Sequence, residues 1–108
     1  DRAESAVNFR VVSAADAEAI AAALWYDDRQ AGLADAFLAE MQAAFESIRS
    51  RPLSMSRLEY YAGTHEVRRC LMQRFPYAVI FLCRPDEVVV VAVAHTRRRP
   101  LYWLQRLG

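Results

Sequence analysis

The side chains best suited to chemistry lie close together near the end of the chain. His95 follows an apolar run, and Arg97, Arg98 and Arg99 come directly after it. A histidine can exchange a proton near neutral pH, and the planar guanidinium of arginine meets two oxygens of an anion at once. This segment is therefore a candidate for proton transfer beside a bound phosphate. The simpler interpretation is a histidine that ends a strand, followed by a solvated arginine cluster beside an acidic partner.

Other candidates for contact with an anion precede and follow this segment. Arg68 and Arg69 are neighbours in a strand-like segment, so they point to opposite faces and at most one serves any given site. Arg74 lies in the next loop and could support the cluster. Tyr102 could stack on a nucleic-acid base.

Two glutamates, Glu59 and Glu66, are candidate bases. Neither has a visible partner in the sequence, and surface exposure is the simpler interpretation of both.

Charge is distributed unevenly along the 108 residues. All 14 basic residues are arginine, and there is no lysine. Residues 1–66 carry a net charge of −5 and residues 67–108 carry +6. A high-GC genome explains the missing lysine but not the segregation. The asymmetry indicates an anionic partner, which could be RNA, DNA or an acidic protein.

Metal, disulfide and membrane classes are disfavoured by composition. The two cysteines, Cys70 and Cys83, are too few for a disulfide framework or a zinc site. We interpret them as buried free thiols in the cytoplasm, although a bridge across a hairpin stays open. No apolar run reaches the roughly 18 residues of a membrane span. We expect no metal, cofactor or membrane contact.

A single domain over residues 1–108 is expected, with a loose tail over residues 1–7. Alternation predicts a first strand over Asn8–Val12, and Ser13 is a candidate N-cap. A helix is predicted over Ala14–Arg29. Its apolar stripe should comprise Ala17, Ile20, Ala21, Leu24 and Trp25.

The remaining elements complete an α+β architecture. A second helix is predicted over Leu33–Ser50, and an irregular loop follows over Leu53–His65. Three strands and a short helix come next, over Glu66–Met72, Tyr77–Cys83, Val88–Ala94 and Leu101–Leu107. The last helix should open at Pro100, with Leu101, Leu104 and Leu107 on one face. The order β-α-α-β-β-β predicts a helical hairpin packed on a mostly antiparallel sheet.

Three stretches give the chain a family resemblance. The first joins Trp25-Tyr26, Gly32-Leu33 and Phe37-Leu38, with Ile48 and Pro52 after them. The second runs from Val67-Arg68-Arg69 into Arg74-Phe75-Pro76-Tyr77. The third runs from Val91 to His95 and on through Arg97-Arg98, Pro100, Tyr102-Trp103 and Arg106-Leu107. Together they resemble the RelE/ParE superfamily of toxins from bacterial toxin–antitoxin modules, also called plasmid stabilisation proteins.

The resemblance implies a small cytoplasmic toxin held inactive by a cognate antitoxin. One branch of the superfamily cuts messenger RNA on the ribosome, and the other poisons DNA gyrase. Metal-free RNA cleavage needs a base, cations for the phosphate and an acid. Here His95, Arg97 and Arg69 would be the catalytic residues.

The absence of lysine rules out a lysine-dependent mechanism, and arginine is a poor base. We therefore favour the ParE-like branch acting on gyrase. The ribosome-dependent nuclease is the alternative, and a degenerate, non-toxic module that only binds its antitoxin is a third. Whether the protein is an enzyme stays open.

Trp25 and Tyr26 are candidates for contact with the antitoxin. They are adjacent on a predicted helix, so both cannot face inward. An acidic antitoxin segment over the arginine-rich half would gain charge-assisted hydrogen bonds.

Overall fold

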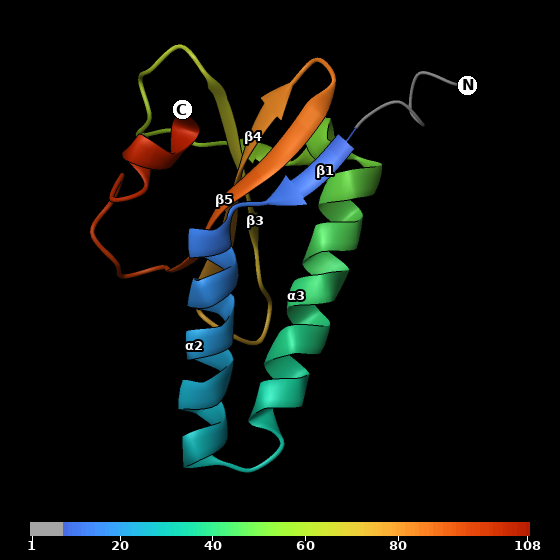
Figure 1. Cartoon of the computed structure of the whole chain (residues 1–108), viewed down its shortest axis with the longest axis vertical. Helices are drawn as coiled ribbons and strands as arrows, with labels where there is room; N and C mark the ends of the chain where they lie inside the picture. Colours follow the sequence, from blue (N-terminus) through green and yellow to red (C-terminus); the bar gives the residue numbers. More distant parts are fainter. Residues whose placement is uncertain (1–7) are drawn as a thin grey trace.

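A five-stranded sheet with two helices on one face forms the domain (Figure 1). The computed structural model describes residues 8–108, so the tail predicted over residues 1–7 lies outside it. The strands are β1 (Asn8–Val11), β2 (Ser56–Arg57), β3 (Glu66–Leu71), β4 (Tyr77–Arg84) and β5 (Glu87–His95). The helices are α2 (Ser13–Arg29) and α3 (Leu33–Ser50), with 3-10 turns η1 (Pro52–Ser54) and η2 (Leu104–Leu107). The predicted α+β architecture is confirmed.

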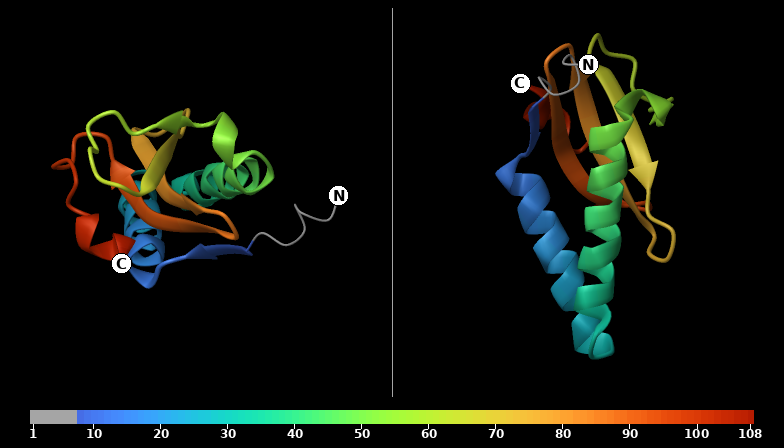
Figure 2. Two further views of the ribbon diagram at one scale, coloured as in Figure 1. Left: turned by 90° about the horizontal axis from the view of Figure 1, so that it is seen from above. Right: turned by 90° about the vertical axis from the view of Figure 1, so that its right-hand side faces the viewer.

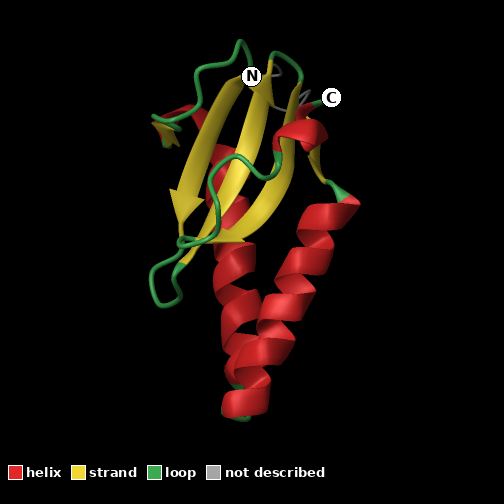
Figure 3. Ribbon diagram, turned by 90° about the vertical axis from the view of Figure 1, so that its left-hand side faces the viewer, coloured by secondary structure: helices red, strands yellow, loops and turns green. Residues whose placement is uncertain are grey.

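The strand order is β1-β5-β4-β3-β2, and only the β1–β5 pair is parallel. The near-continuous valine run of β5 suits a strand buried on both faces, and Val88 to Ala94 are all buried. The helices cover one face, which we call the helix side. The C-terminal segment crosses the other, which we call the far side (Figure 3). The turn between α2 and α3 projects past the end of the sheet (Figure 2).

Helix α2 buries the opposite face from the one predicted. Its buried residues are all alanines, namely Ala15, Ala19, Ala22 and Ala23. Ile20, Leu24 and Trp25, from the predicted stripe, are 50%, 63% and 51% exposed. Ala17 and Ala21 from that stripe are exposed too. Alanine lets α2 lie close to α3 and β5, so the larger apolar side chains turn outward.

The start of α2 also differs from the prediction. Val12, not Ser13, is the N-cap, and no side chain caps the helix. The N–H of Val12 still donates to the carbonyl of Val90, so extended backbone continues to this residue. At the other end the Asp27 carboxylate accepts hydrogen bonds from the N–H groups of Gly32 and Ala34. These two bonds hold the turn that leads into α3.

The segment predicted as a loop over Leu53–His65 contains two short elements, part of η1 and the strand β2. A two-residue strand is too short to show a period of two in the sequence. The Arg68 guanidinium donates to the carbonyl of Met55 at 2.6 Å and so holds β2 beside β3.

The helix predicted over Leu101–Leu107 is only the 3-10 turn Leu104–Leu107. Leu101 adopts a positive φ of 65°, which breaks helical geometry. Leu107 is buried and Leu104 is 43% exposed, so the predicted shared face does not form. Trp103, 1% exposed, is the main anchor of this segment on the far side.

The strand register rules out the disulfide that the sequence left open. Cys70 pairs with Val79 and Cys83 pairs with Glu66, so the cysteines are four pairs apart on the β3–β4 ladder. That separation is about 13 Å, and a disulfide needs Cα atoms within about 7 Å. Both cysteines are free, and burial raises the pKa of both thiols.

Candidate functional site

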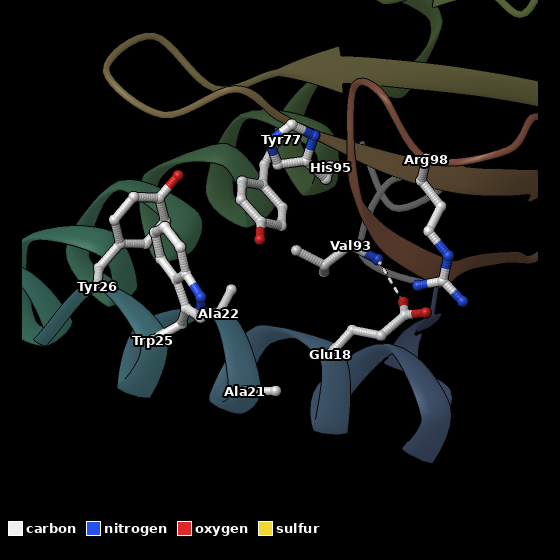
Figure 4. Close-up of a pocket in the computed structure, with 9 residues that line it drawn as sticks. All are labelled: Glu18, Ala21, Ala22, Trp25, Tyr26, Tyr77, Val93, His95 and Arg98. Atoms are coloured by element: carbon white, nitrogen blue, oxygen red, sulfur yellow. Dashed lines mark hydrogen bonds between the residues drawn. The ribbon is translucent and has the colours of Figure 1, made fainter. Parts of the chain in front are cut away.

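A cavity of about 420 Å³ opens between α2 and the adjoining ends of β4 and β5 (Figure 4). We call it the helix-side groove. Its lining residues are Glu18, Ala21, Ala22, Trp25, Tyr26, Tyr77, Val93, His95 and Arg98.

Aromatic side chains form one wall of the groove. Trp25 and Tyr26 meet edge to face with ring centroids 5.1 Å apart. Tyr26 turns towards the core, where it contacts Phe37 and Phe75, whereas Trp25 stays half exposed. Burial raises the pKa of Tyr26 and, with the nearby Tyr26 and Glu18, that of Tyr77. Both phenols are neutral at physiological pH, as tyrosine ordinarily is, and can donate hydrogen bonds.

Glu18 forms the polar end of the groove. Its carboxylate accepts hydrogen bonds from the Val93 N–H at 3.0 Å and the Tyr102 hydroxyl at 2.9 Å. Arg106 pairs with it at 3.1 Å and also donates to the carbonyl of Val91. These bonds pair the backbone N–H of Val93 and the carbonyl of Val91, which lie on β5 beyond Val90, where its pairing with β1 has ended.

The sequence analysis did not identify Glu18. An acid flanked by alanines within the predicted helix was the only available signal. Since three donors already hold its carboxylate, its role here is structural.

His95 ends β5 and turns its ring to the helix side, 5.2 Å from the ring of its cross-strand partner Tyr77. Its Nδ1 accepts a hydrogen bond from the Arg97 N–H, and its carbonyl accepts one from the Arg98 N–H. The bend after β5 therefore positions this ring.

A second, smaller cavity of about 130 Å³ lies on the far side, and we call it the far-face hollow. Arg69 reaches it from β3, on the same face as its cross-strand partner Ile80. The remaining lining residues are Tyr60, Leu71, Ala78, Ala94, His95, Thr96, Arg98, Arg99, Pro100, Tyr102 and Trp103. Of the predicted site residues, the structure thus gathers Arg69, His95, Arg98, Arg99 and Tyr102 around one hollow.

The other predicted arginines lie elsewhere. Arg68 points to the helix side, where it pairs with Glu66 at 2.7 Å. Arg74 lies on the β3–β4 hairpin, where its backbone N–H donates to Glu40. Arg97 lines neither cavity.

Of the predicted catalytic residues, Arg69 and His95 both line the far-face hollow, whereas Arg97 lines neither cavity. The ring of His95 lies on the helix side, and the side chain of Arg69 lies on the far side. Glu66 is paired with Arg68, and the exposed Glu59 lines neither cavity. Among residues 8–108, no Asp or Glu lines the far-face hollow.

Within the described part of the chain, no group of three or more His, Cys, Asp or Glu side chains could hold a metal ion. None of its helices is long and apolar enough to cross a membrane. The fold and the two cavities define a small α+β binding domain, with an aromatic groove on one face of its sheet and a basic hollow on the other.

The sequence of this chain matches a known protein family. Residues 7–100 match the family described as "ParE toxin of type II toxin-antitoxin system, parDE". The chain therefore belongs to the ParE toxin family, and it is a toxin of the ParE type.

The fold has a solved counterpart. A chain of the chromosomal ParDE TA system from P. aeruginosa superposes with a TM-score of 0.71 at 14% identity. The match covers 83% of this chain and 96% of that one. No curated protein matches this chain in sequence.

Proposed function

We propose that this ParE-type toxin acts in the cytoplasm by poisoning DNA gyrase and is neutralised by a cognate antitoxin. The family match over residues 7–100 carries the proposal. The orientation of the His95 ring adds to it: the ring turns to the helix side, whereas Arg69 points to the far side, and a metal-independent nuclease needs its base and cations around one phosphate.

The helix-side groove is the proposed antitoxin site. Its aromatic wall suits a large apolar side chain, and exposed Leu24 and Trp25 continue the apolar surface along α2. Arg98 lies at the end of the groove away from Trp25 and Tyr26, near Glu18, and can pair with a carboxylate of the partner. An amphipathic segment with an apolar face and an acidic residue fits these features.

Controlled expression with two readouts tests the target. The gyrase proposal predicts growth arrest with an SOS response and intact messenger RNA. Rapid loss of translation with cleaved messenger RNA would favour the nuclease alternative instead. No growth effect from a folded chain would indicate a module that only binds its antitoxin.

The gathering of Arg69, Arg98, Arg99 and two tyrosines around the far-face hollow keeps the nuclease as the second candidate. For that candidate, His95→Ala and Arg97→Ala should each lower toxicity while antitoxin binding persists. Unchanged killing by both variants would remove these residues from the site.

A further inference from the structure

The far-face hollow is lined by arginines that form no ion pairs with other residues in 8–108. These arginines are Arg69, Arg98 and Arg99. The arginines that are paired lie elsewhere, at Arg10, Arg29, Arg68, Arg84 and Arg106. With no carboxylate in the lining of the described hollow, this surface is complementary to an anion.

Buried aliphatic side chains form part of the lining of the hollow. Ala78, Ile80 and Ala94 are buried there, while Leu71 and Tyr60 at the rim are 52% and 50% exposed. The pairing of β2 with β3 stops at Arg69, so the β3 edge at Leu71 has no neighbouring strand in the described chain. A partner would therefore find an apolar recess, a basic rim and a sheet edge together.

We propose that the far-face hollow is the surface through which the toxin contacts its target, and that it takes an acidic protein segment bearing an apolar anchor side chain. This inference rests on the proposed function, in which the target is a protein and the antitoxin occupies the helix-side groove. A protein segment fits better than a nucleic-acid strand, because the buried aliphatic part of the lining suits an apolar side chain and offers little to a phosphate.

Arg98 connects the two surfaces. It lines both cavities, and its Cζ lies 3.9 Å from the centroid of the Tyr102 ring. An antitoxin carboxylate that draws this guanidinium into the groove takes one of three cations from the hollow. The antitoxin would then weaken binding of the target electrostatically as well as by blocking the toxin surface sterically.

The test is a set of surface variants with separate readouts. Arg69→Glu/Arg99→Glu reverses two charges at the hollow, and Arg49→Glu/Arg51→Glu reverses two exposed charges at the end of α3. Ala21→Arg blocks the groove at an exposed position. Each chain is checked for an unchanged urea midpoint and then assayed for growth inhibition, binding to purified gyrase holoenzyme and binding to a labelled 12-nucleotide oligo(dT).

We expect Arg69→Glu/Arg99→Glu to bind gyrase at least tenfold more weakly and to lose toxicity. The α3 control and Ala21→Arg should stay within about twofold of wild type. A hollow variant as toxic as wild type would overturn the inference, as would loss of gyrase binding by Ala21→Arg. If the wild type bound the oligonucleotide but not gyrase, and the hollow variant lost that binding, the ligand of the hollow would be a nucleic acid and not a protein segment.

Failure of the proposed function gives different results. A folded wild-type chain that does not inhibit growth overturns the proposed function and this inference together. Toxicity without gyrase binding overturns gyrase as the target alone. Growth inhibition by the hollow variant would then still decide the contact surface.

Discussion

At the scale of single residues, the bonds of Glu18 connect α2, β5 and the C-terminal segment. Its partners Tyr102 and Arg106 belong to that segment, and Val93 belongs to β5. A carboxylate that accepts several hydrogen bonds in a partly buried site is costly to deprive of a donor. The position of the C-terminal segment, and with it one wall of the far-face hollow, thus depends on this cluster.

Replacing Tyr102 by phenylalanine should lower the free energy of unfolding by about 1–2 kcal/mol, because a hydrogen bond to a charged group is lost. Urea unfolding at pH 7 measures this change. Tyr60→Phe is the matched control, since Tyr60 is half exposed, and it should be nearly neutral. Equal stability of wild type and Tyr102→Phe would contradict the role given to the cluster.

The same tyrosine should make stability depend on alkaline pH. Burial, followed by the hydrogen bond to Glu18, raises the pKa of the Tyr102 phenol above its ordinary value of 10.0. The folded state therefore keeps this proton where the unfolded chain releases it. The contribution is complete below pH 10 and falls as the pH rises further. Unfolding between pH 9 and 11 should show a shallower fall for Tyr102→Phe than for wild type, and parallel curves would count against this assignment.

At the scale of the elements, α2 shows what sequence periodicity resolves and what it does not. The existence and length of the helix were predictable from its long apolar run and the glycine after it. Its buried face was not, because both faces are apolar and hydrophobicity favours the larger side chains. Packing instead selects alanine on the side where α2 meets α3 and β5.

In α2, enlarging a buried alanine should therefore lower the free energy of unfolding more than truncating an exposed leucine does. Leu24→Ala removes a large side chain that is 63% exposed and should cost less than about 0.5 kcal/mol. Ala19→Leu adds volume at a position 1% exposed and should cost about 1–3 kcal/mol. Chemical unfolding of both variants decides this, and a more damaging Leu24→Ala would mean that α2 buries its larger residues.

The turn between the helices depends on one glycine. Gly32 adopts a φ of 95°, and a Cβ there meets no atom within 4 Å, so only backbone strain opposes substitution. Gly32→Ala should lower stability by about 1 kcal/mol. Gly32→Asn should lose less, because asparagine tolerates left-handed backbone. Thermal unfolding that ranks asparagine below alanine would contradict this account.

At the scale of the whole molecule, two surfaces on opposite faces of one sheet are the feature that sequence reasoning could not supply. Alternation along β3 was enough to predict that Arg68 and Arg69 point apart. It could not show that the His95 ring turns to the face opposite Arg69, because the β4–β5 register shifts where Ile80 pairs with Ala92 and Phe81 pairs with Val90. The charge split between the two parts of the chain predicted an anionic partner without locating its surface.

We propose that this ParE-type toxin poisons DNA gyrase. The most direct measurement incubates purified toxin with gyrase holoenzyme, relaxed plasmid and ATP, and follows supercoiling and gyrase-linked DNA breaks. We expect the toxin to block supercoiling and to accumulate cleaved plasmid in a dose-dependent manner. Arg69→Glu/Arg99→Glu should need at least tenfold more protein for the same effect. Normal supercoiling at saturating toxin, together with cleavage of messenger RNA in a translation reaction, would contradict it.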